Sequence, residues 1–242
     1  MTSDERSCVD PPGPPAEDPP AGVDRGDRLH DFRGPGIAVT WSRARCTHAA
    51  ACIMNLPVVF MPGRRPWIDL ERGSAADVAR VVERCPTGAL HYRRADGGAQ
   101  EAPPAQNTVT VTHRGPVYVR GDIEIIDESG QRRLTDTRAA LCRCGCSEHK
   151  PFCDNSHLAA GLDDEGVVRD AGPVSDPGAP DAKLRIRLEA GGPLRIEGPF
   201  VLRSADRRTV VPGTRVALCR CGRSRNKPFC DSSHLRARDA GA

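Results

Sequence analysis

The sequence predicts a small α+β module followed by two β-rich modules. The chain has 242 residues but only nine aromatic side chains, together with 22 prolines and 24 glycines. A chain of this composition cannot build one extensive hydrophobic core. Its second half repeats at a spacing of 77 residues without gaps, and its 11 cysteines stand in short groups. Small modules with too little apolar surface commonly depend on metals or disulfides, so we expect bound metal to stabilise all three modules.

The modules are separated by segments rich in proline and charge. Residues 1–34 form a predicted disordered tail, since the first 30 carry seven acidic and three basic side chains. Linkers are expected near 96–106 and at 159–182. They leave an α+β module at 35–95 and two β-rich modules at 107–158 and 183–236. An odd number of cysteines grouped like ligands favours reduced thiols in the cytoplasm. No apolar run reaches membrane-spanning length or forms a secretory signal, so no membrane contact is expected.

The first module contains signals for two strands and one helix. Residues 37–41 alternate like a strand, and residues 90–94 are expected to pair with them. Between them, Ser74 followed by Asp77 resembles a capping box, which opens a helix with Val78, Val81 and Val82 facing inward. Pro86 disfavours helical geometry in the residue before it, so the helix is expected to stop at Cys85.

Three cysteines of this module are candidate metal ligands. Cys46 and Cys52 are separated by five residues, and Cys85 stands before a proline and a turn of small residues. This pattern resembles divergent single-cluster ferredoxins, in which a middle cysteine would occupy position 49, here Ala49. The resemblance implies a ferredoxin-like domain with a [3Fe-4S] cluster on three thiolates, or a [4Fe-4S] cluster completed by His48 or an exogenous group. Three unrelated buried cysteines are the alternative.

Each repeat begins with signals for a β-hairpin. Residues 109–113 and 184–188 alternate between apolar and polar side chains. A Gly-Pro pair then turns the chain into a second strand, at 117–119 in the first repeat and at 194–196 in the second. The repeats are therefore predicted to be small β structures that precede cysteine-rich loops.

The two loops share four potential ligands in the pattern Cys-x-Cys-x8-Cys-x3-His. The shared donors are Cys142, Cys144, Cys153 and His157 in the first repeat and Cys219, Cys221, Cys230 and His234 in the second. Cys146 and His149 have no counterparts and are expected to be an ordinary thiol and a solvated side chain. A Cys3His set also suits structural zinc, although the one-residue spacing of the first two cysteines fits zinc sites poorly.

The residues around these ligands predict local structure. Pro151 and Pro228 should fix a turn before the third cysteine. Asp154 and Asp231 are possible helix N-caps, which would place the third cysteine and the histidine on one helix face. The Ser147 and Ser224 hydroxyls have two open roles, as donors to bound sulfur or as stabilisers of the turn.

Both loops resemble the CDGSH iron–sulfur motif of the mitoNEET family. Every defining position matches except the glycine, which is replaced by Asn155 and Ser232. The resemblance implies one [2Fe-2S] cluster in each motif, with the first two cysteines on one iron and the third cysteine and the histidine on the other. MitoNEET-like proteins are dimers of one-motif chains, so the two repeats are expected to pair within this chain as a pseudo-twofold unit.

These observations favour an iron–sulfur protein that transfers electrons or clusters between redox partner proteins. No catalytic constellation is evident, so we expect no enzyme, although the chain would suit an electron-transfer subunit of an oxidoreductase. The alternatives are a redox or iron sensor and a structural zinc-binding module contacting nucleic acid. A net charge of +3 with scattered arginines argues against nucleic acid. Asp163, Asp164 and Glu165 are expected to form a solvated patch.

Overall fold

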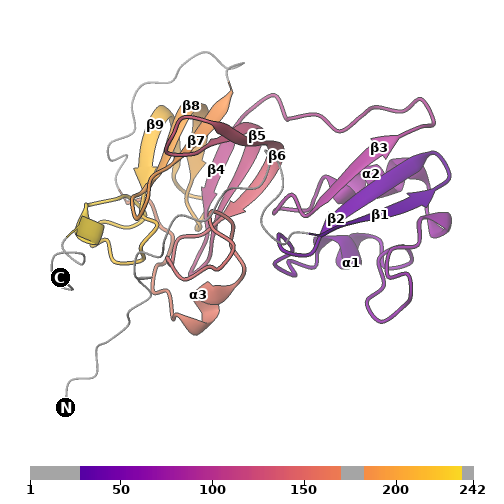
Figure 1. Ribbon diagram of the computed structural model, residues 1–242, viewed down its shortest axis with the longest axis horizontal. Coiled ribbons are helices and arrows are strands. Elements are labelled where there is room, and N and C mark those ends of the chain that lie inside the picture. Colours follow the sequence, from indigo (N-terminus) through magenta and orange to yellow (C-terminus); the bar gives the residue numbers. More distant parts are fainter. Residues whose placement is uncertain (1–27, 170–182, 236–242) are drawn as a thin grey trace.

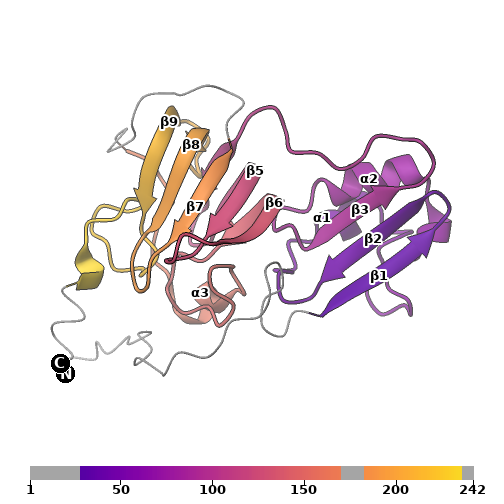
Figure 2. The same ribbon diagram turned by 45° about the horizontal axis from the view of Figure 1, so that its top comes forward.

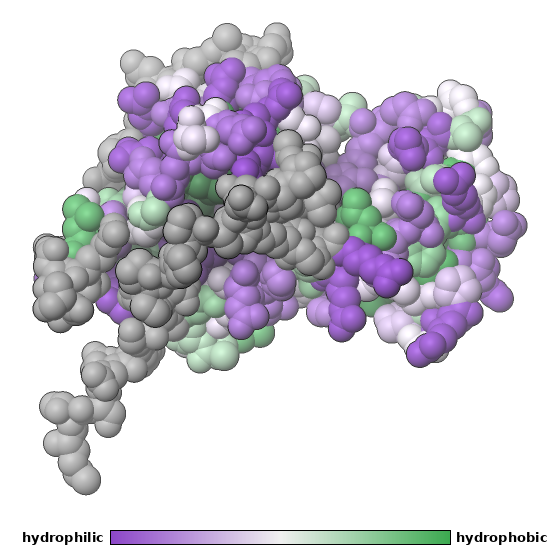
Figure 3. Space-filling model, in the orientation of Figure 1, coloured by the Kyte–Doolittle hydropathy of each residue, from purple (hydrophilic) through white to green (hydrophobic). Residues whose placement is uncertain are grey.

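The computed structural model describes residues 28–169 and 183–235. The predicted tail up to residue 27, Cys8, and the linker from 170 to 182 lie outside these ranges. The described chain forms an upstream module and a repeat region, which lie side by side in Figures 1 and 2. Hydrophilic residues cover most of the face seen in Figure 3, while apolar residues appear in small patches. None of the helices in the described ranges has the length and apolar character needed to cross a membrane.

The upstream module contains one antiparallel sheet in the order β1-β2-β3. Its elements are β1 (Leu29–Gly34), β2 (Ile37–Ser42), α1 (Ala51–Asn55), the 3-10 helix η1 (Leu70–Arg72), α2 (Ala75–Val82) and β3 (Leu90–Arg94). The predicted pairing of β2 with β3 is confirmed. β1 takes up residues assigned to the tail, because its backbone pairs with β2 along its whole length. The ferredoxin-like class of this module stays a prediction.

Helix α2 covers the sheet of the upstream module. The Ser74 hydroxyl accepts a hydrogen bond of 3.1 Å from the Asp77 amide, which confirms the predicted cap. Val78, Val81 and Val82 are buried in the core of the module, also as predicted. The helix ends at Val82, three residues earlier than expected, so Cys85 stands in the turn that follows.

The repeat region is β-rich, which confirms the expected class of the two repeats. Its strands are β4 (Thr108–Val111), β5 (Val117–Ile126), β6 (Arg132–Leu141), β7 (Leu184–Leu188), β8 (Leu194–Arg203) and β9 (Val210–Leu218), and one short helix, α3 (Ser156–Ala159), follows the first loop. Each repeat thus has a third strand, β6 or β9, that the sequence patterns did not predict. These third strands pair along the second strand of their own repeat and lead directly into the cysteine-rich loops.

The two repeats exchange their first strands. β4 runs parallel to β8 of the other repeat, and β7 runs parallel to β5. The two pairings are reciprocal, since Val109 faces Leu202 and Ile186, 77 residues after Val109, faces Ile125. A single hydrophobic core contains buried residues from both repeats, so the repeats form one packed unit.

Strand β6 is the strand nearest the upstream module in both ribbon views (Figures 1 and 2). Arg138 of β6 pairs with Glu101 and donates to the backbone carbonyls of Leu90, at 2.9 Å, and Val82. Asp136 of β6 pairs with Arg45 of the upstream module at 2.6 Å. His91 contacts both carboxylates, 3.0 Å from Glu101 and 3.5 Å from Asp136. We call the side chains of Arg45, His91, Glu101, Asp136 and Arg138 the junction.

Candidate metal centres

The first cysteine-rich loop leaves β6 and returns to the end of the same strand. The Cys142 amide donates to the Pro151 carbonyl at 2.9 Å, and the Cys153 amide donates to the Ala140 carbonyl at 2.9 Å. These bonds extend the strand ladder across the loop and bring its third cysteine beside its first. The second loop repeats both bonds, from Cys219 and Cys230.

The four expected donors of the first loop form two close pairs. The sulfur atoms of Cys142 and Cys144 lie 3.6 Å apart, and Cys153 Sγ lies 3.3 Å from His157 Nδ1. All four residues are buried. Two thiolates on one tetrahedral metal with bonds of about 2.3 Å would lie about 3.7 Å apart, and a thiolate and an imidazole slightly closer. Each pair therefore has the spacing of two ligands on one metal.

The second loop has the same geometry with more exposed ligands. Cys219 and Cys221 have sulfur atoms 3.8 Å apart, and Cys230 Sγ lies 3.6 Å from His234 Nδ1. Cys219 is buried, whereas Cys221, Cys230 and His234 are only partly buried. The two sites thus share their donor arrangement and differ in their access to solvent.

The hydrogen bond between the two thiols of each pair shifts their pKa values in opposite directions. A hydrogen bond from Cys144 lowers the pKa of Cys142 to about 6 and raises that of Cys144. In the second loop the bond from Cys219 lowers the pKa of Cys221 to about 6. In each pair, one thiol is thereby shifted toward the thiolate, the form that binds metals. Burial, together with the positive charge of Arg143, lowers the pKa of His157 and favours the neutral imidazole that acts as a ligand.

The turns around the ligands differ in part from the predictions. Asn155 and Ser232 adopt left-handed backbone conformations, with φ of 74° and 64°, so both perform the backbone role of the family's glycine. The expectation that Asp154 caps a helix is wrong: α3 begins after Asn155, and Asp154 instead accepts hydrogen bonds from Ser156. Cys153 therefore precedes the helix, and the left-handed turn brings His157 back toward it.

The serine side chains stabilise the turns. Ser147 Oγ donates to the Phe152 carbonyl at 2.7 Å and accepts from the His149 amide at 3.1 Å. Ser224 makes the equivalent bonds in the second loop. Of the two roles left open by the sequence, the structure shows the turn role. The sulfur atom of Cys153 accepts instead from the backbone amide of Asn155, at 3.5 Å.

Two further residues near the first loop differ from the sequence-based expectation. Asp164 is not solvated, since it is 8% exposed and pairs with buried Arg143. Arg143 also donates to the Gly115 carbonyl at 2.8 Å, so this ion pair fixes the loop against the preceding hairpin. Sequence patterns gave no sign of the pair, because its members are 21 residues apart. Cys146, expected to be an ordinary thiol, is disulfide-bonded.

The two loops lie against each other. A Cβ atom added at Gly145 would lie 3.4 Å from the Arg220 carbonyl oxygen and the Cys221 Cα, and one at Gly222 would lie 3.2 Å from the Cys144 carbonyl oxygen. Arg143 interacts electrostatically with Cys219, and Arg220 interacts with Cys142. The backbones of the two donor-bearing loops are therefore in contact, and glycine at this point allows them to approach closely.

The three upstream cysteines line one cavity of about 240 Å³. Cys85 is buried and Cys46 and Cys52 are partly buried, while His48 and Ala49 also line the cavity but are exposed. A cavity of this size is unusual in a small packed core. The indole nitrogens of Trp41 and Trp67, both from cavity-lining residues, are buried donors for which the described structure offers no hydrogen-bond partner. Sulfur ligands and unused donors suit an iron–sulfur cluster, whose sulfides accept hydrogen bonds.

A second, wider cleft of about 1150 Å³ lies between the two units and is lined by junction residues, including His91, Glu101 and Asp136. None of the described cysteines lines this cleft. Its lining also includes residues 148–152 of the first cysteine-rich loop, so the cleft runs along both the junction and that loop.

Comparisons with known proteins agree with this division of the chain. Residues 32–95 match the family described as a divergent 4Fe-4S mono-cluster, and residues 114–158 and 191–235 match the iron-binding zinc finger of CDGSH type. The chain therefore contains domains of both families. It joins one divergent 4Fe-4S mono-cluster domain to two tandem CDGSH domains and is a metal-cluster-binding protein.

Two relatives among the curated proteins each match a stretch of 62 residues of the chain. The uncharacterized protein YjdI from Escherichia coli K12 is 36% identical over 62 residues, which cover 82% of that protein and 26% of this chain. YjdI from Escherichia coli O157:H7 matches to the same extent. No solved structure matches the chain significantly.

Proposed function

We propose that the protein transfers single electrons between redox partner proteins through three iron–sulfur clusters. Two [2Fe-2S] clusters would be held by the four donors of each CDGSH loop. One [4Fe-4S] or [3Fe-4S] cluster would be held by Cys46, Cys52 and Cys85, with His48 as the candidate fourth ligand. The protein supplies ligands, exclusion of water and spacing, and the clusters supply the redox chemistry.

The observation that carries this proposal is the arrangement of donors in separate pairs. Four ligands of one zinc ion would converge on a single point. In the described part of the chain, no three histidine, cysteine or acidic side chains are grouped so as to hold one ion. The CDGSH donors instead form two pairs with single-metal spacing. This favours a centre with two metals, each held by one pair, over a mononuclear zinc site.

The contact between the two CDGSH loops supports transfer between their two sites. Their backbones meet at Gly145 and Gly222, so the loops that carry the two sets of donors lie directly against each other.

Anaerobic purification with metal and sulfide analysis, followed by electron paramagnetic resonance (EPR), tests the proposal. We expect iron with acid-labile sulfide and reducible signals from histidine-ligated [2Fe-2S] clusters. Zinc without sulfide would contradict the proposal. An oxidised three-iron signal upstream would identify a [3Fe-4S] cluster. A reduced four-iron signal that His48→Ala converts to the three-iron form would identify His48 as the fourth ligand.

A further inference from the structure

A hydrogen bond joins the cluster-binding loop of the 4Fe-4S domain to the first CDGSH loop. Asn155 Nδ2 donates to the Thr47 carbonyl at 3.0 Å. Thr47 directly follows Cys46, and Asn155 lies two residues after Cys153. The two ligand-bearing loops are therefore in direct contact at this point.

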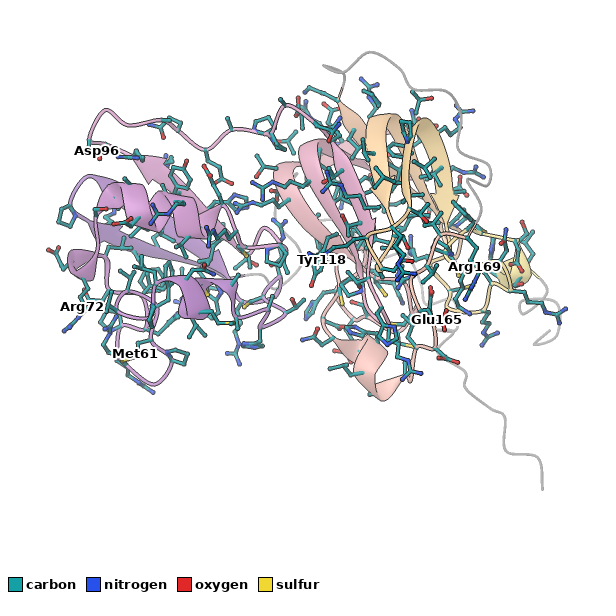
Figure 4. The ribbon with its side chains drawn as sticks, turned by 180° about the vertical axis from the view of Figure 1, so that it is seen from behind. Met61, Arg72, Asp96, Tyr118, Glu165 and Arg169 are labelled. Atoms are coloured by element: carbon teal, nitrogen blue, oxygen red, sulfur yellow. The ribbon has the colours of Figure 1, made fainter. Side chains whose placement is uncertain are left out.

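Tyr118 of β5 lies beside this contact. Its hydroxyl forms a hydrogen bond with the side chain of Thr47, and the sulfur atoms of Cys153 and Cys85 both act on it electrostatically. Figure 4 shows Tyr118 where the sheet of the repeats meets the 4Fe-4S domain. We call Thr47, Tyr118 and Asn155 the bridge. The hydroxyl of Tyr118 is thus within electrostatic reach of one cysteine of each site.

The second repeat does not reproduce the bridge. Arg195 replaces Tyr118 at the equivalent position, is exposed, and pairs with Glu189. Ser232 replaces Asn155 and is also exposed. Within residues 28–169 and 183–235, the bridge is therefore specific to the first CDGSH site. The second loop lies at the far side of the repeat region from that domain (Figures 1 and 2).

The second CDGSH site is suited to contact an external protein. His157 of the first site is 9% exposed, whereas His234 is only partly buried. The second loop also carries Arg223 and Arg225 where the first carries Cys146 and Glu148, and both loops carry a lysine at the next such position, Lys150 or Lys227. A basic rim around a partly exposed redox site favours an acidic protein partner.

We propose that the three sites form an ordered relay, in which Tyr118 and Asn155 are the positioning residues between the 4Fe-4S domain and the first CDGSH site. This inference rests on the proposed electron-transfer function. With clusters bound, the first CDGSH site would accept one electron from the upstream site, so that one upstream iron would be oxidised to ferric and one ferric ion of the CDGSH pair reduced to ferrous. The second CDGSH site would then accept this electron and deliver it to an acidic one-electron acceptor protein. No bond is made or broken, and an external one-electron reductant refills the upstream site.

Asn155→Gly tests the bridge with little disturbance, because glycine accepts the left-handed backbone that Asn155 adopts. It removes the side-chain bond to Thr47 alone. Ser232→Gly is the matched control, since it makes the same change in the second loop, away from the 4Fe-4S domain. Tyr118→Phe is a second test, which keeps the ring and removes only the hydroxyl bond to Thr47.

The full-length chain is reduced with dithionite, freed of excess reductant, and mixed anaerobically with an excess of an oxidised acidic blue-copper protein. Freeze-quench EPR then follows the upstream signal and the CDGSH signals separately. In Asn155→Gly, and to a smaller extent in Tyr118→Phe, we expect the upstream signal to decay several-fold more slowly than in the unmodified chain. The CDGSH signals should decay at their normal rate, and Ser232→Gly should leave the upstream decay unchanged.

The outcomes separate the relay from the proposed function. A chain that reduces no blue-copper protein contradicts electron transfer itself. A chain that reduces it, with upstream decay equally fast in Asn155→Gly, Tyr118→Phe and the unmodified protein, overturns the bridge and leaves electron transfer standing. Upstream EPR line shapes at equilibrium show whether each variant retains its cluster, so that cluster loss is not mistaken for slow transfer.

Discussion

Replacement of Arg138 by methionine should destabilise the protein far more than the same change at Arg215. The two arginines occupy equivalent positions, 77 residues apart, in β6 and β9. The Arg138 side chain is 2% exposed and pairs with Glu101, which is 9% exposed. The Arg215 side chain is 69% exposed, with its guanidinium 3.5 Å from Glu197. The repeat thus supplies a control with the same chemistry in a solvated setting.

The expected magnitude follows from burial. Removal of one member of a buried ion pair costs about 3–5 kcal/mol, because the other charge stays buried without its partner. Glu101 keeps hydrogen bonds from His91 and the Tyr92 amide, so the lower end, about 3 kcal/mol, is expected. An exposed pair contributes about 0–1 kcal/mol, which sets the expectation for Arg215→Met.

Urea unfolding followed by tryptophan fluorescence measures this difference. Both tryptophans of the chain, Trp41 and Trp67, belong to the 4Fe-4S domain. They therefore report whether a change in β6 of the first repeat loosens the neighbouring domain. If Arg138→Met and Arg215→Met lowered the free energy of unfolding equally, the junction would not hold the two units together.

Three other expectations concern the junction, the first loop and the shared core. Burial lowers the pKa of His91, but Asp136 and Glu101 outweigh it and raise the pKa to about 9; Arg45 and Arg138 complete the surrounding charges. Because this folded-state pKa exceeds the unfolded value of about 6.5, the stabilisation is complete below pH 6.5 and is lost as the pH rises through about 9. Because the ring is one-third exposed, we expect this stabilisation to be about 1–2 kcal/mol. The urea unfolding midpoint should therefore fall as the pH rises, and His91→Gln should make the midpoint insensitive to pH. Ser147→Ala should destabilise the first loop by roughly 1–3 kcal/mol and speed the loss of visible absorbance, with the reduction potential nearly unchanged; a large change in potential would mean that the hydroxyl contacts the cluster. Ile125→Ala, in a side chain that is 1% exposed, should cost about 2–5 kcal/mol and lower the unfolding midpoints of both CDGSH domains together. A shift of the first domain alone would show that the repeats do not share one core.

The features visible in the sequence are those determined by neighbouring residues. Alternation in residues 37–41 predicted β2, residues 90–94 were expected to pair with it as β3, and Ser74 marked the start of α2. The 77-residue repeat identified the donors because the two loops can be compared position by position, and only the ligands are shared as cysteine or histidine in both. Asn155 and Ser232 stand where the motif has glycine, and both adopt a left-handed backbone.

The features that were missed depend on contacts between distant residues. Asp136 and Arg138 interrupt the alternation of β6, because their side chains serve the junction and not the core of the repeats. Glu101 lies in a segment interpreted as a linker, yet it contacts His91 and Arg138. Asp154 resembled an N-cap by spacing, but the left-handed turn at Asn155 moves the start of the helix beyond it. Such outcomes are set by tertiary structure, which local patterns do not encode.

The exchange of first strands between the two repeats has a consequence for how the halves can change. In an assembly of two identical polypeptides, every substitution occurs twice, so a residue that suits one side is imposed on the other. Here the halves are encoded separately while their reciprocal strand pairing keeps them folded as one body. The first repeat can therefore acquire residues that hold the 4Fe-4S domain, while the second repeat can acquire different residues that bind partner proteins.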